Sequence, residues 1–492
     1  NNNKQRHVKR RKIQKFNQAN FAKLLISEMS SSSSGRRFLK RYTQSEVRDM
    51  IENYQDERNQ RQLVEISRML YVKSNQYKRL INYFSDMLLF PYFIVPNQDI
   101  SNIDRDKAVE QYYEISMLVD KMKLKHEMRN VLRVSFVEDV FYGYIHMDKN
   151  DFYIQKIDSS LCKITHVEDG VYNFSIDMSY FEANEERLVG WAKEIQLKYE
   201  AWKKEKKKNR QIGDYVELSV NNTICIKLNE ELREIIPPFV GTFDSIFDID
   251  AFKQLRKNKE ELNNYMALVQ KLPIRTNTDD INDFLIDEEF FRHFHNMVVD
   301  IAPDNVGVVT SPMDIDFIRF DKDKVDSDGV AKAERDFWAG SGTSQSLFSV
   351  DKNSNQGILL SIKTDEEIVF SVLAQIERWL NRFIKNHIKN TLYTVKLMEV
   401  THFNQKEVFE RLTTAGNNGV PVRTQISAVV GMSPVETINM LHLENDILNL
   451  DEKFIPLQTS HTQSGNDKGG RPEKDADELT DEGIKSRDKK IE

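Results

Sequence analysis

The sequence predicts an α+β fold that is mainly helical, and three features of the chain indicate it. Apolar residues recur at helical spacing over several long stretches, most regularly from Ile358 to Ile388. Between residues 140 and 228, short segments rich in β-branched and aromatic residues alternate with turn residues, which is typical of strands. The chain has 492 residues, which suffices for about two to four domains with a large total core.

Charge and composition exclude several classes of protein. Hydrophobic residues make up 39% and charged residues 30%, as in a soluble globular protein, and the formal net charge is −7. A free nucleic-acid binder is usually basic because phosphate neutralisation drives its binding, so the whole chain is not expected to bind DNA tightly. The only two cysteines, Cys162 and Cys225, are too few for a disulfide framework and are expected as small core residues. This usage fits folding in a reducing cytoplasm.

No targeting or membrane segment is expected. The basic stretch from Lys4 to Lys15 has no apolar region behind it. The longest apolar run, Met87–Val95, is interrupted by Pro91 and is shorter than the roughly 20 apolar residues that cross a bilayer. The sequence therefore predicts no membrane partner.

The first half of the chain is predicted to be helical, then strand-rich. Residues 1–42 are basic and polar and are expected to be flexible. Thr43, with Glu46 three positions later, forms a capping-box sequence that predicts a helix start. Further helices are expected at 59–90, 104–122 and 185–210. Strands are expected at 133–137, 140–146, 152–157, 162–166, 171–176, 214–220 and 223–228.

The second half is predicted to place a compact insert between two helices, followed by a polar loop and a long helix. A helix from Phe247 to Lys271 is stopped by Pro273. The insert, Ile274 to Phe320, is expected to hold a helix at 279–299 and a strand pair at 306–310 and 313–320. A helix at 326–339, the long helix at 358–388, a helix at 423–430 closed by Gly431 and a helix start at Ser433-Pro434 follow. Residues 458–492 are expected to be disordered.

The sequence predicts no catalytic, cofactor or metal site. It contains no G-x-x-x-x-G-K-[ST] phosphate-binding loop, so ATP turnover is not expected. The lysine-rich residues 203–208 are interpreted as a solvated helix end, with phosphate contact as the alternative. His293 and His295 would point apart on a helix and are expected at the surface.

Two pairs of aspartates keep an enzymatic alternative open. Asp248/Asp250 and Asp314/Asp316 are interpreted as solvated positions, but two carboxylates on one face can hold a cation. The alternative is a metal-dependent nucleic-acid-processing enzyme with a large helical insert, and metal-dependent activity of the isolated chain would favour it. A third alternative is a monomeric helical scaffold, which the particle mass would distinguish.

Three segments of the chain resemble the portal proteins of tailed bacteriophages. The first runs from Ile236-Pro237-Pro238-Phe239 through the helix that ends at Pro273. The second is the succession of helix, loop and long helix from Asp326 to Ile388, and the third is the acidic end from Gly469 to Gly483. The order of these segments over nearly the whole chain carries the resemblance, since none of them is a catalytic-grade motif.

The resemblance implies the portal fold with wing, stem, clip and crown parts. The implied divisions are a flexible basic arm (1–42), a wing of helices and strands (43–246), a stem helix (247–272), a clip (273–322), a second stem helix (323–341), a tunnel loop (342–357), a long wing helix with a strand (358–404), a helical crown (405–457) and a disordered acidic tail (458–492).

The resemblance also implies a function, without enzymatic activity and without a cofactor. Such chains would form a closed dodecameric ring at one capsid vertex, through which double-stranded DNA is packaged and ejected, and would nucleate head assembly. The implied partners are the terminase large subunit, a head-completion adaptor, and the major capsid and scaffolding proteins. The ring would assemble in the bacterial host cytoplasm and reside in the virion. The residues expected to face DNA in the tunnel loop are Ser344, Gln345, Ser346, Lys352, Asn353 and Asn355, and the cations of the stem are Lys253, Arg256, Lys257 and Lys259.

Overall fold

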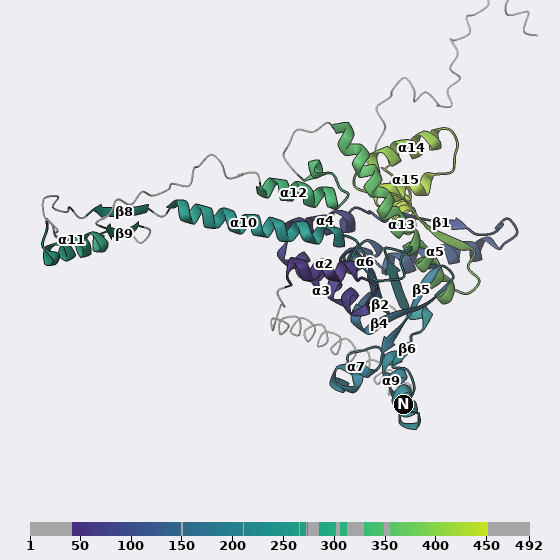
Figure 1. Cartoon of the computed structure of the whole chain (residues 1–492). Helices are drawn as coiled ribbons and strands as arrows, with labels where there is room; N and C mark the ends of the chain where they lie inside the picture. Colours follow the sequence, from purple (N-terminus) through teal and green to yellow (C-terminus); the bar gives the residue numbers. More distant parts are fainter. Residues whose placement is uncertain are drawn as a thin grey trace, which may run out of the picture. The chain divides into compact units, whose positions relative to one another are not determined.

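The computed structural model is mainly helical with small sheets, which confirms the α+β class (Figure 1). It describes residues 42–148, 151–209, 211–264, 266–271, 273, 285–301, 306–311, 329–348 and 355–450. The predicted acidic tail and nearly all of the predicted N-terminal arm lie outside these residues. The contacts divide the chain into two units, 1–435 and 436–492.

The N-terminal helices begin and end where side chains cap them. They are α2 (Gln44–Glu52), α3 (Glu57–Lys73), α4 (Asn75–Asp86), α5 (Arg105–Lys121) and α6 (Leu124–Glu138). The capping box is confirmed, because the Thr43 side chain accepts from the Glu46 amide while the Glu46 carboxylate accepts from the Thr43 amide. The predicted helix at 59–90 is divided at Ser74, whose backbone is extended and whose hydroxyl caps α4.

The strand predicted at 133–137 is wrong, because these residues belong to helix α6. Met128, Val131, Leu132 and Ser135 are all buried and recur at helical spacing. The β-branched residues of this stretch therefore face a helical core, and tertiary packing overrides their strand propensity. Helix α6 ends at Asp139, which has a left-handed φ of 73° and leads directly into the first central strand.

Two antiparallel three-stranded sheets follow, as the sequence predicted in outline. Their strands are β2 (Val140–Met147), β3 (Phe152–Ile157), β4 (Cys162–Glu168), β5 (Val171–Asp177), β6 (Tyr215–Glu217) and β7 (Thr223–Lys227), in the orders β3-β2-β7 and β4-β5-β6. Gly143 lies at the centre of β2, where a Cβ atom would approach side chains of Phe141, Ile154 and Ile224 within 2.6–2.9 Å. The neighbouring strands therefore require a residue without a side chain.

Between these strands the predicted helix at 185–210 is shorter than expected. The segment forms α7 (Ser179–Glu182), α8 (Glu185–Leu188) and α9 (Lys193–Lys208). Helix α9 buries Ile195, Tyr199 and Trp202. Two lysines of its lysine-rich end form ion pairs, since Lys203 contacts Glu185 and Lys206 contacts Asp214 at 3.1 Å. These ion pairs agree with the interpretation of a solvated helix end.

The insert is built differently from the prediction. Helix α10 (Phe243–Asn264) ends before residue 271, and strand β8 (Met266–Lys271) follows it. β8 pairs in parallel with β9 (Val306–Ser311), and α11 (Glu288–Ile301), which contacts β9, lies between them in sequence. The predicted strand at 313–320 lies outside the described residues. Because the pairing of β8 depends on a strand some forty residues away (Met266 opposite Val306), local periodicity did not reveal it.

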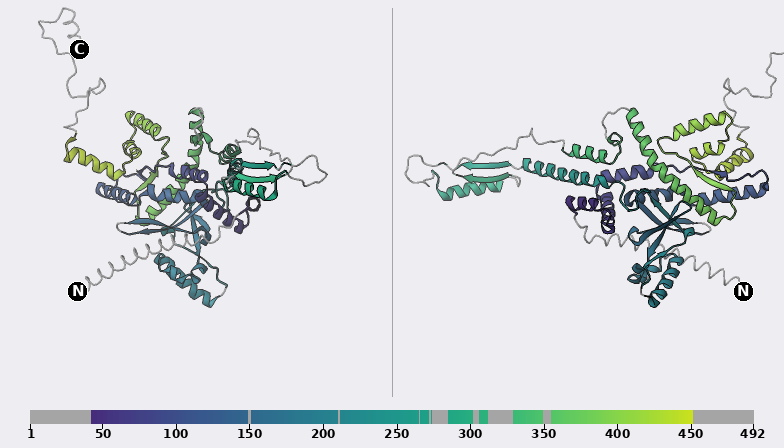
Figure 2. Two further views of the ribbon diagram at one scale, coloured as in Figure 1. Left: turned by 90° about the vertical axis from the view of Figure 1, so that its left-hand side faces the viewer. Right: turned by 45° about the vertical axis from the view of Figure 1, so that its right-hand side comes forward.

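Helix α13 (Asn355–His387) confirms the long helix predicted at 358–388, and it packs against strands of both central sheets (Figure 2). Residues of its apolar stripe are at most 3% exposed: Val369, Val372, Leu373, Ile376, Trp379, Leu380, Phe383 and Ile384. Three polar side chains of α13 bind the strand region as well. The Gln375 amide donates to the carbonyl of Lys227 at 2.7 Å, Trp379 Nε1 donates to the carbonyl of Thr223 at 3.1 Å, and Arg382 donates to Asn173 at 3.1 Å.

The C-terminal helices follow the predicted pattern, whereas residues 92–96 form a strand that the sequence analysis did not predict. Strand β10 (Tyr393–Leu397) pairs antiparallel with β1 (Tyr92–Pro96), and helices α14 (Gln405–Asn417), α15 (Arg423–Val430) and α16 (Pro434–Leu441) follow. Helix α15 ends at Gly431, whose φ of 110° favours glycine, and α16 starts beside Ser433, as predicted. A π-helical turn, His442–Ile447, lies in the second unit. No helix among the described residues is long and apolar enough to span a membrane.

Replacing Leu380 with Asp is expected to prevent folding, because Leu380 is 0% exposed and an unpaired buried charge costs several kcal/mol. We expect a loss of about 4 kcal/mol or more in the free energy of unfolding, measured by urea denaturation, or no soluble protein. The matched control is Ile368→Asp on the same helix, since Ile368 is 46% exposed. A soluble Leu380→Asp protein with unchanged stability would contradict the placement of α13.

Candidate functional site

The segment between helices α12 (Gly329–Gly340) and α13 contains the residues predicted to face DNA. We define its described part, Ser341 to Phe348, as the strap. Of the predicted loop residues, Ser344, Gln345 and Ser346 lie in the strap, where a short 3-10 helix spans Gln345–Leu347. Ser344 and Gln345 are partly exposed. Lys352 and Asn353 lie outside the described residues, and Asn355 is the first residue of α13.

The strap turns away from α12 through local hydrogen bonds. The Ser341 amide donates to the carbonyl of Phe337 at 3.0 Å, and the Ser341 hydroxyl donates to the carbonyl of Trp338 at 2.7 Å. Gly342 has a φ of 75°, a left-handed conformation that ends the helix and favours glycine. This glycine therefore sets the direction in which the strap leaves α12.

Phe348 anchors the far end of the strap through contacts with α4 and α12. Its ring stacks on Trp338 of α12, with centroids 4.1 Å apart and planes inclined by 16°. The edge of Tyr83 on α4 lies against it at 5.4 Å, and the guanidinium of Arg79 lies 5.0 Å from its centroid. These three side chains form the aromatic seat of Phe348.

The seat is connected to a buried carboxylate at the start of α13. The Tyr83 hydroxyl donates to Asp365 Oδ2 at 2.9 Å, and Asp365 is only 3% exposed. Burial raises the pKa of Asp365 to about 6, although the hydrogen bond from Tyr83 acts in the opposite direction. The adjacent Glu366 is also buried and accepts a hydrogen bond from the Thr401 hydroxyl.

Sequence reasoning missed Asp365, Tyr83 and Arg79 as parts of this site. A signal for Asp365 was present, because it lies four and seven positions before Val369 and Val372, in register with the buried stripe of α13. No sequence signal distinguishes Tyr83 or Arg79 from other residues of an amphipathic helix. Their role depends on how α4 and α12 pack together, which local sequence does not specify.

The predicted stem helices α10 and α12 lie side by side (Figure 1). Their contact is close at Gly329 of α12, where a Cβ atom would lie 3.0 Å from the ring of Phe252 on α10. The predicted stem cations all lie on α10: Lys253 is partly exposed, Arg256 and Lys257 are exposed, and the side chain of Lys259 lies outside the described residues. The predicted stem cations and the predicted loop residues therefore belong to different elements: the cations lie on α10, and the loop residues follow α12.

The aspartate pairs do not form a metal site in the described part of the chain. Asp248 accepts a hydrogen bond from Gln44 at 3.1 Å, whereas Asp250 is exposed, and residues two apart on a helix face different directions. Asp314 and Asp316 lie outside the described residues. Across the described ranges, no group of three or more His, Cys, Asp or Glu side chains is placed to hold a metal ion.

The predicted surface histidines and core cysteines lie as expected. His293 is exposed and His295 is partly exposed on α11. Cys162 and Cys225 are buried, and burial raises the pKa of both thiols. A buried thiol with a raised pKa is a poor nucleophile, so both cysteines have the properties of core residues.

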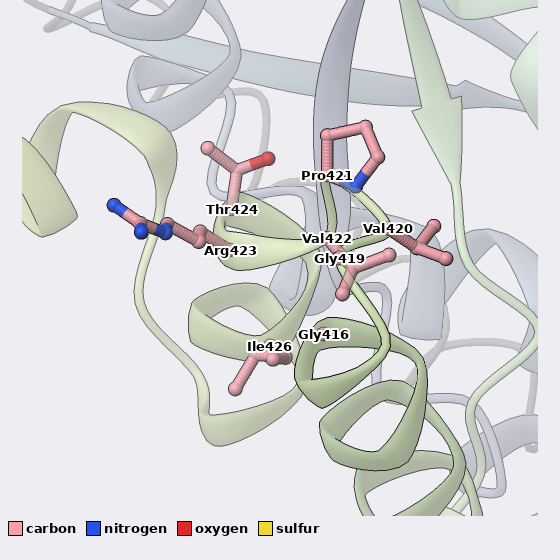
Figure 3. A pocket seen from close by; sticks show the side chains of 8 residues that line it. All are labelled: Gly416, Gly419, Val420, Pro421, Val422, Arg423, Thr424 and Ile426. Atoms are coloured by element: carbon pink, nitrogen blue, oxygen red, sulfur yellow. The ribbon is translucent and has the colours of Figure 1, made fainter. Parts of the chain in front are cut away.

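A hollow of about 500 Å³ lies between the end of α14 and the start of α15 (Figure 3). Its lining residues are Gly416, Gly419, Val420, Pro421, Val422, Arg423, Thr424 and Ile426. Apart from Arg423 and Thr424 their side chains are apolar or absent, so the hollow lacks the convergent polar groups that orient a small-molecule substrate.

No family model matches the chain, and no curated protein matches its sequence. Three solved structures with which it shares a likeness come from gene transfer agent (GTA) particles. A chain from the neck of an empty GTA particle has a sequence identity of 12% and a TM-score of 0.42. A chain from the virion of a native GTA particle has an identity of 10% and a TM-score of 0.40. A chain from the neck of a native GTA particle, determined with C12 symmetry, has an identity of 10% and a TM-score of 0.41. Each likeness covers 76% of this chain and 94% of the other chain.

Replacing Asp365 with Asn is expected to stabilise the protein above pH 6 and to have little effect near pH 4. The pKa of Asp365 is raised from 3.8 to about 6, so the folded state binds this proton more tightly than the unfolded state. Stability therefore falls as the pH rises from about 4 through 6, where the buried carboxyl ionises. Asn retains an oxygen that accepts from Tyr83 but carries no charge, and we expect a gain of about 1–3 kcal/mol at pH 8.

Urea denaturation at pH 4.5 and pH 8 measures this effect. The matched control is Glu367→Gln on the same helix. Because Glu367 is exposed, this change removes one carboxylate charge that is not buried. If the two variants change the free energy of unfolding equally at both pH values, the buried charge of Asp365 does not limit stability.

Proposed function

We propose that this chain is a portal-type subunit that assembles into a closed ring at one vertex of a phage capsid and forms a channel for DNA. One observation carries the proposal: the succession of α10, an insert, α12, the strap and α13 in a single chain. Helices α10 and α12 pack together although strands β8 and β9 and helix α11 separate them in sequence. A polar segment then leads directly into a 33-residue helix packed on the central strands.

This succession supports the wing, stem, clip and crown divisions that the sequence resemblance implies. The paired helices correspond to the stem, and the β8-α11-β9 unit between them corresponds to the clip. Helix α13 with strand β10 corresponds to the long helix and strand of the wing, and α14, α15 and α16 to the crown. The strap and the residues after it correspond to the tunnel loop.

The chemistry of the strap and the residues after it suits a conduit in which DNA must slide. Residues 341–357 contain Gly, Ser and Asn and only one cation, Lys352, which follows Asp351. A basic lining would hold phosphates through counterion release, whereas neutral polar side chains make weak contacts that break readily. The net charge of −7 acts in the same direction. We therefore assign loose DNA contact to Ser344, Gln345, Ser346, Lys352, Asn353 and Asn355.

The exposed face of α11 supports docking partners at the proposed clip. Four apolar residues of this helix are between 44% and 74% exposed: Phe290, Phe294, Met297 and Ile301. Their spacing places them on one face of the helix. Contiguous exposed apolar side chains mark interaction surfaces. We assign this face to the terminase large subunit during packaging and to a head-completion adaptor afterwards, with the major capsid and scaffolding proteins as further partners of the ring.

The ring itself is the first test of this function. Native mass spectrometry and negative-stain microscopy of the purified chain at micromolar concentration are expected to show closed rings, with the dodecamer as the expected size. A closed ring requires a heterologous interface, in which two different surfaces of one chain meet. If the chain remains monomeric at every concentration and in the presence of scaffolding protein, the proposal is wrong.

Deleting residues 349–355 is expected to leave ring assembly intact and to impair DNA packaging or retention in assembled heads. The segment is polar and small, so its removal takes little apolar surface from the fold. The matched control deletes residues 486–492, a segment of equal length at the C-terminus. If heads built with the 349–355 deletion package and hold full-length DNA as well as the control does, residues 349–355 have no role in handling DNA.

A further inference from the structure

Phe348 makes the aromatic contacts between the strap and its neighbours. The described backbone hydrogen bonds of the strap are all local: Ser341 donates to Phe337, Gly342 to Ala339, Leu347 to Ser344 and Phe348 to Gln345. None of these bonds belongs to a sheet, so none has to break if the strap leaves its neighbours. Thr343 is also buried and the 3-10 helix contacts α12, but the contacts of Phe348 with Arg79, Tyr83 and Trp338 join the strap to both α4 and α12.

We propose that Phe348 and its aromatic seat form a two-state latch, in which the buried Asp365 carboxylate favours release of the strap. In the seated state the ring of Phe348 lies on Trp338. Tyr83 contacts this ring with its edge and donates its hydroxyl to Asp365. In the released state Phe348 leaves the seat, and water reaches Tyr83 and the carboxylate behind it. The use of this latch in a DNA channel rests on the proposed function, but the latch itself does not.

The geometry gives the two states opposite driving forces. Seating buries an aromatic ring between a stacked indole and a cation, which is favourable. In the seated structure Asp365 is 3% exposed and accepts a hydrogen bond from the Tyr83 hydroxyl, whose ring edge lies against Phe348. At neutral pH this carboxyl is ionised, since its pKa is about 6, and an ionised buried carboxylate gains hydration when its cover opens.

Neighbouring charges do not relieve this burial. Next to Asp365 lies Glu366, which is buried, carries the same sign of charge and raises the pKa of Tyr83 along with Asp365. Arg79, the cation of the seat, contacts the ring of Phe348. Packed side-chain interfaces switch between discrete arrangements more readily than they deform continuously. Tyr83 is therefore the element that couples the charge of Asp365 to the position of Phe348.

Release of Phe348 would extend the reach of the strap from the end of α12. Each strap residue that leaves the seat adds up to about 3.5 Å of reach to the chain. In a DNA channel, the seated state would keep Ser344 and Gln345 at a fixed position, and the released state would let them follow a moving ligand. The latch thus regulates the same segment that the proposed function assigns to DNA contact.

Hydrogen exchange of the full-length chain, followed by mass spectrometry of peptides covering residues 341–348, tests the latch at pH 7.5. Phe348→Ala is expected to speed exchange in these peptides about tenfold or more, because it removes the ring that seats the strap. Asp365→Asn is expected to slow exchange about threefold to tenfold, and Tyr83→Phe to speed it by a similar factor, because it leaves the carboxylate without its donor.

The double variant Tyr83→Phe with Asp365→Asn distinguishes the latch from a general loss of packing. Once the charge is gone, removal of the Tyr83 hydroxyl is expected to have little further effect on strap exchange, so the two changes are not additive. One matched control is Tyr71→Phe, because the Tyr71 hydroxyl donates to Asn82 at 3.1 Å and not to Asp365. The other is Phe290→Ala on the exposed face of α11. Neither control is expected to change exchange in residues 341–348.

Several outcomes would overturn the latch. Unchanged strap exchange in Phe348→Ala would show that the ring does not hold the strap. Changes in the same direction for Asp365→Asn and Tyr83→Phe, or additive effects in the double variant, would show that the charge does not favour release. If Phe348→Ala fails to fold, Phe348→Leu replaces it and must show intermediate exchange. Since these measurements need neither a ring nor DNA, their failure is separate from failure of the ring test.

Discussion

The docking of α13 on the outer edge of β7 is the interaction on which the rest of the described fold depends. β7 ends the order β3-β2-β7, so on one side it has no strand partner in its sheet. Gln375 bonds both the amide and the carbonyl of Lys227, at 3.3 and 2.7 Å, and Trp379 bonds the carbonyl of Thr223. The helix thereby satisfies backbone groups that an unpaired strand would leave open, while its apolar stripe covers the sheet. Strand β10, which follows α13, packs against this helix as well.

A buried ion pair at the end of β7 holds the chain segment that leads to α10. Lys227, at the end of β7, donates to Asp139 at 2.8 Å, and their side chains are 2% and 0% exposed. Asp139 also accepts from the amides of Asn229 and Ile236, so it fixes the chain that leads to Pro237. Buried ion pairs add little net stability because both charges lose hydration. We infer that this pair specifies where the segment before α10 lies, which in turn places α10 beside α12.

Sequence reasoning predicted the parts of the fold that local pattern controls and missed the parts that depend on distant contacts. The stripe of α13, the capping box at Thr43 and the glycine that closes α15 all depend on residues within a few positions of one another, and all three are present. The strand predicted at 133–137 was wrong, because packing on other helices makes this stretch helical. The helix predicted over 266–271 was wrong, because pairing with β9 makes this stretch a strand. For the same reason, the seat of Phe348 on Tyr83 and Arg79 was not foreseen, and α13 begins at Asn355, within the segment predicted as a loop.

The two ends of α13 differ in how firmly they are held, and this difference explains where motion is to be expected. From Val369 to Ile384 the stripe is almost fully buried and is reinforced by hydrogen bonds to the strand region. Nearer its start, Leu359 and Leu360 are 57% and 68% exposed, and the buried positions include the carboxylates of Asp365 and Glu366. Local opening occurs where buried apolar contacts are few and buried charge is present. The less buried end of α13 is the end that follows the strap in sequence, and its other end is packed on the central sheets. In the proposed latch, release of Phe348 would therefore not disturb those sheets.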